Sequence, residues 1–242
     1  MIDFNCPYSY IGLERLKKAC ENLNIDAIWE FKPFELEPLT GKRPVMTTAE
    51  RYAEKHELNL DDALDEISEI EEIAFDDGLK INYKDMPLTS SKDALRLCKF
   101  CQSIHPEIAL KLAEEIFHKR LVENENIADI KVLHKIAVSC GLEENETSKI
   151  LENNYYNIEI YLDQEEAVSY GINATPCFIL NYNGERLIMP GVFSTEEFEN
   201  ALEDMLSGEI EKKTFVWDAL AKKFLLVLNW NYIKSIVWII IW

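Results

Sequence analysis

One cysteine near the start of the chain, Cys6, has neighbours that favour thiol chemistry. It follows a short apolar segment and precedes Pro7 and apolar residues at helical spacing, so we expect a strand to end and a helix to begin there. Proline suits the first helical position, because its missing N–H needs no partner. Unpaired N–H groups and the positive end of the helix dipole favour the reactive thiolate. The pattern predicts a nucleophilic Cys6; the alternative is a small buried side chain, the usual state of a free cysteine.

A second stretch with chemical interest lies far downstream, at Thr175-Pro176. This dipeptide precedes an apolar strand, and a proline is tolerated at the first residue of a strand. It is also a place where a cis peptide bond serves a tight turn. Residues 181–185 are typical of a hairpin, and Ser194 is typical of the N-cap of a final helix. The sequence therefore predicts a loop, a hairpin and a helix in that order.

Together the two stretches resemble the DsbA-like thioredoxin-fold family, most closely its FrnE-like oxidoreductase branch. The resemblance covers about residues 1–206. It rests on Cys6-Pro7-Tyr8 with Tyr10-Ile11-Gly12, on Phe34-Glu35-Leu36-Glu37-Pro38, on the loop from Gly171 to Pro176, and on Pro190-Gly191 through Phe198.

The resemblance implies a role for each of these positions. In this family the first cysteine of a C-x-x-C attacks, the second resolves, and a cis-proline loop lies against the pair and holds the substrate chain. Carried over, Cys6 is the attacking thiol, Thr175 and Pro176 form the loop, and Pro7 and Tyr8 contact substrate. The implied fold is α/β, a thioredoxin-like fold with an all-helical insertion domain.

The chain departs from the family pattern at the resolving position, which Ser9 occupies. Without a thiol there, the dithiol–disulfide cycle cannot close within the motif. We therefore expect a thiol–disulfide oxidoreductase with a single active-site thiol, acting through a mixed disulfide, with Cys6 and Ser9 as the catalytic pair. The Pro-Tyr-Ser-Tyr run also looks like the kappa-class glutathione transferase and 2-hydroxychromene-2-carboxylate isomerase branch. A glutathione-dependent isomerase or transferase is thus one alternative, and a degenerate, non-catalytic thiol-binding module is another.

The remaining cysteines give weaker hypotheses. Cys177 follows Pro176 directly and is a candidate second thiol, although alternation along a strand could point it away from Cys6. Cys98 and Cys101 form a C-x-x-C in the middle of a predicted helix, where core packing is the favoured interpretation over a redox pair. A zinc site needs two further ligands at suitable spacing, and we expect no metal.

The elements that position these residues follow from periodicity and turn signals. We expect the second strand within residues 24–34 and helices almost throughout residues 47–170, the last two of them at 143–161 and 163–170. The predicted domains are a thioredoxin-like domain at 1–44 and 163–207, a helical insertion at 45–162, and an apolar tail at 208–242. The basic pair Lys42-Arg43, in a loop, could meet a substrate carboxylate, although a solvated loop is the favoured interpretation.

The composition limits the kinds of partner and the cellular location that we expect for this protein. The formal net charge of -19 argues against nucleic acid and favours solubility. We expect a thiol or disulfide substrate, either a protein or glutathione, no cofactor apart from glutathione as a co-substrate, and a homodimer as an open alternative. With no leader before the motif and six cysteines expected to be reduced, the predicted location is the cytoplasm. The tail, from Phe224 onward, is a poor membrane anchor because of Lys234 and two asparagines, and we expect it to lie outside the catalytic domain. The alternatives are an extra element folded on the body, a dimer surface or a spurious reading-frame extension.

Overall fold

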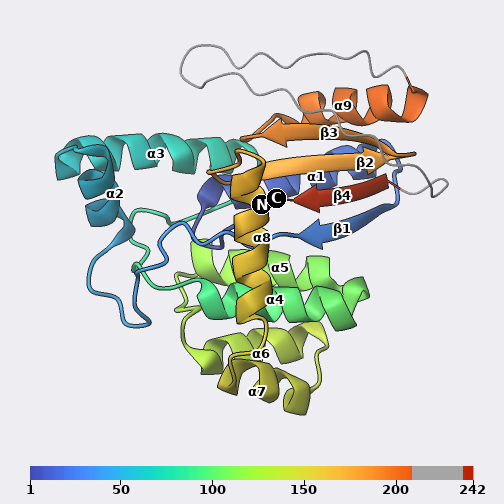
Figure 1. The fold of residues 1–242 in the computed structure, drawn as a ribbon. Helices are drawn as coiled ribbons and strands as arrows, with labels where there is room; N and C mark the ends of the chain where they lie inside the picture. The colour runs from blue at the N-terminus through green and yellow to red at the C-terminus, as the bar shows by residue number, and fades with distance from the viewer. Residues whose placement is uncertain (209–236, 242) are drawn as a thin grey trace.

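A four-stranded sheet organises the computed structural model of the chain, which describes residues 1–208 and 237–241 (Figure 1). The strand order is β1-β4-β2-β3. β1 and β4 are parallel, whereas β4 and β2, and β2 and β3, are antiparallel. The strands are β1 (Ala27–Phe31), β2 (Cys177–Tyr182), β3 (Glu185–Pro190) and β4 (Val237–Ile241).

The second position of the sheet is shared by two distant parts of the chain. β4 fills most of it, and its last paired residue, Ile241, lies opposite Phe31 and Phe178. Beyond that point Met1 and Ile2 continue the same column: Met1 exchanges backbone hydrogen bonds with Cys177, and Ile2 is bridged to the segment after β1. The N-terminus and the end of β4 accordingly lie side by side in Figure 1.

This arrangement corrects two expectations. Residues 1–4 do not form a strand of their own and contribute a single bridge, between Ile2 and Pro33. Residues 237–241 of the tail belong to the sheet, contrary to the expectation that the tail lies outside the catalytic domain. The physical reason is that β1 and β2 each leave a row of backbone N–H and C=O groups that only a strand between them can satisfy. Residues 209–236, which include most of the predicted apolar tail, lie outside the described residues.

Helices cover both faces of the sheet (Figure 1). α1 and α9 pack against each other on one face, and α8 crosses the other. Gly12 allows α1 to approach β2 closely, because a Cβ there would lie 2.6 Å from Cζ of Phe178. These helices are α1 (Pro7–Asn22), α8 (Asn157–Ser169) and α9 (Thr195–Ser207). As expected, α9 starts at an N-cap, Ser194, with a capping box.

Six further helices form the insertion between β1 and α8. In Figure 1, α2 and α3 extend to one side of the sheet, while α4 to α7 stack beneath it. They are α2 (Thr48–His56), α3 (Leu60–Asp76), α4 (Lys92–Ile104), α5 (Pro106–Leu121), α6 (Ile130–Cys140) and α7 (Glu144–Glu152). Thr47 caps the start of α2 with a capping box, Asp129 caps the start of α6, and Gly141 ends α6.

The insertion and the sheet share one hydrophobic core. The ring of Phe117, on α5, lies 4.7 Å from that of Phe4 and 5.3 Å from that of Tyr10, measured between centroids. The insertion therefore supports the first turn of α1 directly. The result is the expected α/β architecture, a thioredoxin-like fold with an all-helical insertion.

The last helices of the insertion differ from their predicted bounds. The helix expected over residues 143–161 ends at Glu152, and a new one starts after Tyr156, whose backbone is left-handed at φ 65°. A left-handed residue cannot continue a right-handed helix. α8 therefore crosses the predicted domain boundary at residue 162, and Ala167 packs on the sheet beside Cys177. Among the described residues no helix is both long and apolar enough to span a membrane.

Candidate active site

Cys6 is the N-cap residue of α1. Its backbone is extended, at φ -96° and ψ 112°, and Pro7 occupies the first turn as predicted. The Cys6 N–H donates to the carbonyl of Asp3 at 3.0 Å, and the Ser9 N–H donates to the carbonyl of Cys6 at 3.2 Å. These two bonds make a tight turn into the helix, which holds the thiol beside the unpaired N–H groups of the first turn.

The predicted neighbour of Cys6 lies next to it. The peptide bond between Thr175 and Pro176 is cis. The Cys6 thiol donates to the Thr175 carbonyl at 3.7 Å, across a separation of 169 residues. On the other side of the loop, the Gly191 N–H donates to the Pro176 carbonyl at 2.9 Å. The helix start and the proline loop are therefore brought together, as the sequence predicted.

Two buried hydroxyls flank the sulfur. Neither Ser9 Oγ nor Thr175 Oγ1 has a partner within ordinary hydrogen-bond geometry among the described residues. The Cys6 side chain is 5% exposed. This burial raises the pKa of the thiol, while Ser9 and Thr175 lower it by stabilising the thiolate, and the charge of Asp3 raises it. The expectation of a thiolate favoured by the helix start is thus opposed by desolvation, the largest of these effects.

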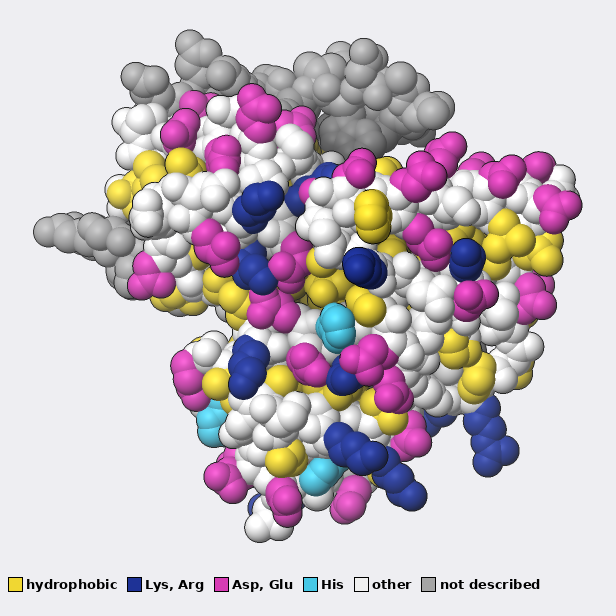
Figure 2. Space-filling model, turned by 180° about the vertical axis from the view of Figure 1, so that it is seen from behind, with side chains coloured by type: hydrophobic (Ala, Val, Ile, Leu, Met, Phe, Trp, Pro, Cys, Tyr) yellow, Lys and Arg dark blue, Asp and Glu magenta, His cyan; other side chains and the backbone are white. Residues whose placement is uncertain are grey.

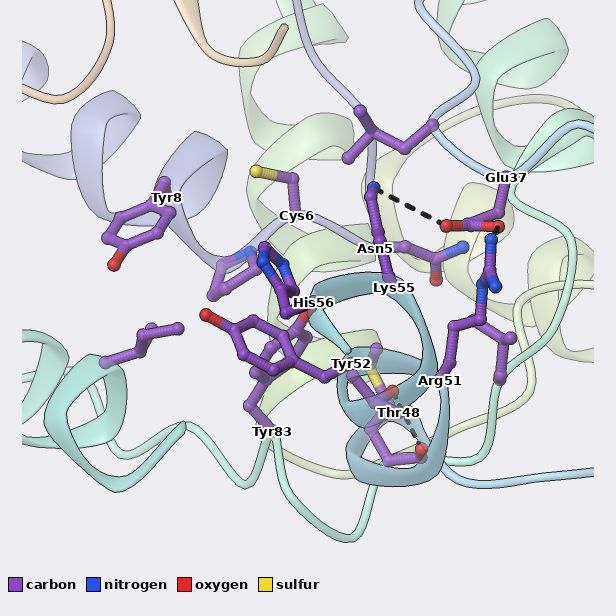
Figure 3. Close-up of a pocket in the computed structure, with 15 residues that line it drawn as sticks. Asn5, Cys6, Tyr8, Glu37, Thr48, Arg51, Tyr52, Lys55, His56 and Tyr83 are labelled. Carbon is purple, nitrogen blue, oxygen red and sulfur yellow. Dashed lines mark hydrogen bonds and ion pairs between the residues drawn. The ribbon is translucent and has the colours of Figure 1, made fainter. Parts of the chain in front are cut away.

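A pocket with a volume of about 140 Å³ opens beside Cys6 (Figure 3). One wall comes from the turn before α1, one from α2, and one from the connector between α3 and α4. Its lining residues are Asn5, Cys6, Pro7, Tyr8, Leu36, Glu37, Thr48, Arg51, Tyr52, Lys55, His56, Ile70, Tyr83, Met86 and Leu88. The predicted contact residues Pro7 and Tyr8 are among them.

One corner of this pocket carries opposite charges. Nε of Arg51 donates to Glu37 at 3.0 Å, and Nζ of Lys55 lies 3.6 Å from the same carboxylate. The corner thus presents two cations around one anion, in the pocket that Cys6 also lines (Figure 3). The basic loop pair Lys42-Arg43, considered as a contact for a substrate carboxylate, does not line the pocket; Lys42 instead pairs with Asp93 at 2.6 Å.

An aromatic wall was not predicted. The ring of Tyr52 stacks on that of His56 at 4.2 Å, and its hydroxyl donates to Glu66 at 2.8 Å. Burial raises the pKa of Tyr8 and of Tyr83, and the charge of Cys6 raises both further. The capping box at Thr47 indicates in the sequence that α2 begins there. No local pattern predicts which face of that helix lines the pocket with Cys6.

The other cysteines lie away from this pocket. Cys177 is buried in a small cluster with Met1 and Ile179, whereas its neighbour Phe178 faces α1 and α9. Because neighbouring strand residues point to opposite faces, this geometry gives a resolving role no support. Cys98 and Cys101 are buried in the main core. The described residues contain no cluster of three or more metal-ligating side chains.

Comparison with known proteins gives the family. Residues 1–203 match the DSBA-like thioredoxin domain. The chain is 24% identical over 209 residues to the uncharacterized protein YwbO of Bacillus subtilis, a match that covers 84% of this chain and 93% of YwbO.

Solved structures show the same fold. The probable DsbA oxidoreductase SCO1869 of Streptomyces coelicolor superposes with a TM-score of 0.71 at 20% identity, covering 93% of this chain and 91% of that one. The cytosolic disulfide reductase DsbM of Pseudomonas aeruginosa, solved with GSH, superposes with a TM-score of 0.56 at 14% identity, covering 85% and 96%. These likenesses confirm the predicted thioredoxin-like fold.

Proposed function

Because the chain belongs to the DSBA-like thioredoxin domain family, we propose that it is a thiol–disulfide oxidoreductase that works through one thiol, Cys6. The observation that carries the proposal is the contact of the Cys6 thiol with the Thr175 carbonyl, 3.7 Å away, at the wall of a pocket. A helix start, a proline loop and a space for substrate meet at that sulfur. The FrnE-like character of the site remains a prediction from the sequence.

The proposed reaction has two exchange steps. In the first, the Cys6 thiolate attacks one sulfur of a substrate disulfide, the S–S bond breaks, and the other sulfur leaves as a thiolate that takes up the proton lost by Cys6. In the second, an external thiol attacks the mixed disulfide and releases Cys6. The external thiol is needed because Ser9 cannot form a disulfide.

Each surrounding group has a defined part in this scheme. The hydroxyls of Ser9 and Thr175 donate to the sulfur when it is negatively charged, which is consistent with their lowering the pKa of Cys6. Pro7 and Tyr8 line the pocket that receives the group attached to the attacked sulfur. The backbone of Thr175 and Pro176 lies against an extended substrate.

The test is formation of a mixed disulfide. The protein is incubated with hydroxyethyl disulfide and the adduct is located by mass spectrometry. In the parent protein we expect one adduct, on Cys6. In Cys6→Ala the overall rate of adduct formation should be lower by about 10³-fold or more. Cys98→Ala should react like the parent. A full rate in Cys6→Ala, or an adduct mainly on another cysteine, would end the proposal.

The charged corner of the pocket favours a second candidate, a glutathione-dependent isomerase or transferase. Arg51 and Lys55 around Glu37 present both signs of charge, which complements the ammonium and carboxylate of an amino-acid-like group. Glutathione is then a co-substrate held beside Cys6. Saturable glutathione binding that weakens in Arg51→Gln, together with no disulfide exchange at Cys6, would favour this candidate over the first.

The raised pKa of Cys6 is the observation that favours a third candidate, a non-catalytic thiol-binding module. A thiol that stays protonated near neutral pH reacts slowly, since the thiolate is the nucleophile. The rate of Cys6 alkylation, measured against pH, separates the oxidoreductase from the binding module. A rate per thiolate no greater than that of free cysteine would support the binding module.

Partners and location follow from the same proposal. We propose a protein or glutathione thiol or disulfide as substrate, with a homodimer still to be tested by sedimentation. Acidic side chains are spread over the face drawn in Figure 2, which fits the net charge of -19 and disfavours a nucleic-acid partner. All six cysteines are unpaired, which supports a reducing compartment such as the cytoplasm.

A further inference from the structure

A buried arginine of the insertion reaches the turn that carries the thiol. Arg120, on α5, has an exposed fraction of 0%. Its Nε donates to the side-chain oxygen of Asn5 at 2.7 Å, one of its terminal nitrogens donates to the carbonyl of Pro87 at 2.8 Å, and the other to that of Glu125 at 3.4 Å. The planar guanidinium can hold several acceptors at fixed angles, which a lysine cannot do.

Asn5 connects Arg120 to Cys6, because it accepts from Arg120 and directly precedes Cys6 in the chain. Besides accepting from Arg120, the Asn5 side chain donates to the carbonyl of Thr89 at 2.8 Å. Its backbone N–H donates to the carboxylate of Asp3 at 2.9 Å. The side chain and the backbone N–H of Asn5, the residue before the thiol, are thus engaged by buried partners.

Asp3 is the countercharge of this cluster. It is fully buried, and its carboxylate also accepts from the backbone N–H of Leu36 at 2.7 Å. Arg120 and Asp3 interact electrostatically: desolvation lowers the pKa of Arg120 to about 10, and the charge of Asp3 acts against this change. Desolvation raises the pKa of Asp3, and the charge of Arg120 acts against it. Each charge therefore makes burial of the other less costly.

The same arginine also holds the opposite wall of the pocket. Pro87, which accepts from Arg120, lies between the lining residues Met86 and Leu88. The carbonyl of Met86 accepts from the backbone of Thr48 at 2.8 Å, and this bond ties α2 to the connector. A line of buried hydrogen bonds thus runs from the Cys6 turn through Arg120 to the helix that carries the charged corner.

From this geometry we infer that Arg120 is a positioning residue for Cys6: it fixes the thiol-bearing turn through Asn5 and balances the charge of Asp3 beside the sulfur. The inference rests on the proposed thiol chemistry and deepens it. Nothing in the Cys6 motif itself indicates it, because Arg120 belongs to the insertion. The insertion then acts on the reactive sulfur and does more than cover the sheet.

Other charged or titratable groups also face Cys6. Asp3 acts from the preceding turn, and Tyr8 from α1. Tyr83 acts from the connector, and it is in turn influenced by Arg120. Arg51, Tyr52, Lys55 and His56 line the pocket from α2, and Glu37 lines it as well. Apart from the Arg96 control, the experiment changes only Asp3 and Arg120, so that the contributions of the remaining groups stay constant.

The test measures the alkylation rate of Cys6 by iodoacetamide, a neutral probe, from pH 6 to 10 in the full chain. Peptide mass spectrometry assigns the label to Cys6. We expect Arg120→Gln to slow the rate at pH 8 by about threefold to tenfold, because the charge of Asp3 is no longer balanced. Asp3→Asn should raise the rate by a similar factor, and the double variant should return toward the parent.

Arg120→Lys separates charge from geometry. It keeps the positive charge but loses the planar fork, so its pH profile should stay near that of the parent while the Tm falls. Arg96 provides a matched control: it is also a buried arginine, bonded to Asp93 at 2.7 Å and to the carbonyl of Ile150 at 2.7 Å, and it does not line the pocket. Arg96→Gln should lower the Tm and leave the Cys6 profile unchanged.

The outcomes are distinguishable. Opposite shifts of the profile in Asp3→Asn and Arg120→Gln, absent in Arg96→Gln, support the inference. Equal profiles in all these variants, or a slowing of the rate in every destabilised variant, would overturn it and leave Arg120 with a structural role alone. Failure of the proposed function is a separate result, since mixed-disulfide formation by the parent protein does not enter this comparison.

Discussion

The chain contains two stretches that match the C-x-x-C redox motif, one completely and one in part. In the structure they lie in opposite environments. Cys98 and Cys101 form the complete C-x-x-C, yet both lie inside α4 with their side chains in the main core. Cys6 and Ser9 form an incomplete motif, yet they stand at a helix start beside a proline loop and a pocket. The candidate site that we propose belongs to the incomplete motif.

The difference shows that spacing alone does not make a reactive thiol. Burial raises the pKa of Cys101 to about 12, and the nearby charges of Cys140 and Glu107 act in the same direction. Burial also raises the pKa of Cys6, but there Ser9 and Thr175 act in the opposite direction. A thiolate needs donors and access to a substrate, and these come from the ends of helices and from loops more readily than from a helix interior.

The strongest way to sharpen this comparison is to complete the Cys6 motif. Ser9→Cys places a second thiol one helical turn from Cys6, and attack within the protein replaces attack by an external thiol. We expect the mixed disulfide to decay about 10²-fold faster. The decay is measured by stopped-flow detection of the coloured thiol that it releases. An unchanged lifetime would mean that the two positions cannot form a disulfide in this fold.

Gly12→Ala tests whether the first turn of α1 depends on its close approach to β2. The added Cβ would lie 2.6 Å from Phe178, so either the helix or the ring must move. We expect a loss of about 1–3 kcal/mol in the free energy of unfolding and slower Cys6 alkylation. Gly41→Ala is the control, because its Cβ would have no neighbour closer than 3.9 Å. Equal stability in the two variants would contradict the packing argument.

Ser9→Ala probes the donor that the Cys98 motif lacks. Removing the hydroxyl takes away a hydrogen bond to the thiolate, which raises the pKa of Cys6 further and lowers the thiolate fraction near neutral pH. The alkylation rate at pH 8 should fall about tenfold, from the usual strength of hydrogen bonds to charged groups. Ser103→Ala, on an exposed position of α4, should have no effect. A rate equal to that of the parent would remove Ser9 from the mechanism.

The smallest expected effect concerns the other motif. Burial raises the pKa of Cys98, so the folded protein keeps a proton that the unfolded chain releases above about pH 8.5. Stability from this group is complete below that pH and is lost as the pH rises. Cys98→Ala should cost about 1–2 kcal/mol at pH 7 and show a smaller alkaline decrease in Tm than the parent. A change in the rate of mixed-disulfide formation at Cys6 in this variant would instead show that the two motifs are coupled.

Local signals determined much of this protein. The start of α1 at Cys6-Pro7, the caps at Thr47 and Ser194 and the hairpin between β2 and β3 follow from residues a few positions apart. The resemblance carried by two short stretches was enough to predict the fold and the meeting of Cys6 with Thr175. Each of these rests on backbone preferences or on a motif that the amino-acid sequence displays directly.

Only the tertiary structure decided the rest of the site. Three features depend on packing between distant segments: α2 contributes Arg51 and Lys55 to the pocket that Cys6 also lines, Arg120 holds the turn before Cys6, and β4 lies between β1 and β2. Periodicity tells that a helix has a buried face, but not which partner covers it. The desolvation of Cys6 is likewise a property of that packing, because it depends on how much water the surrounding elements exclude.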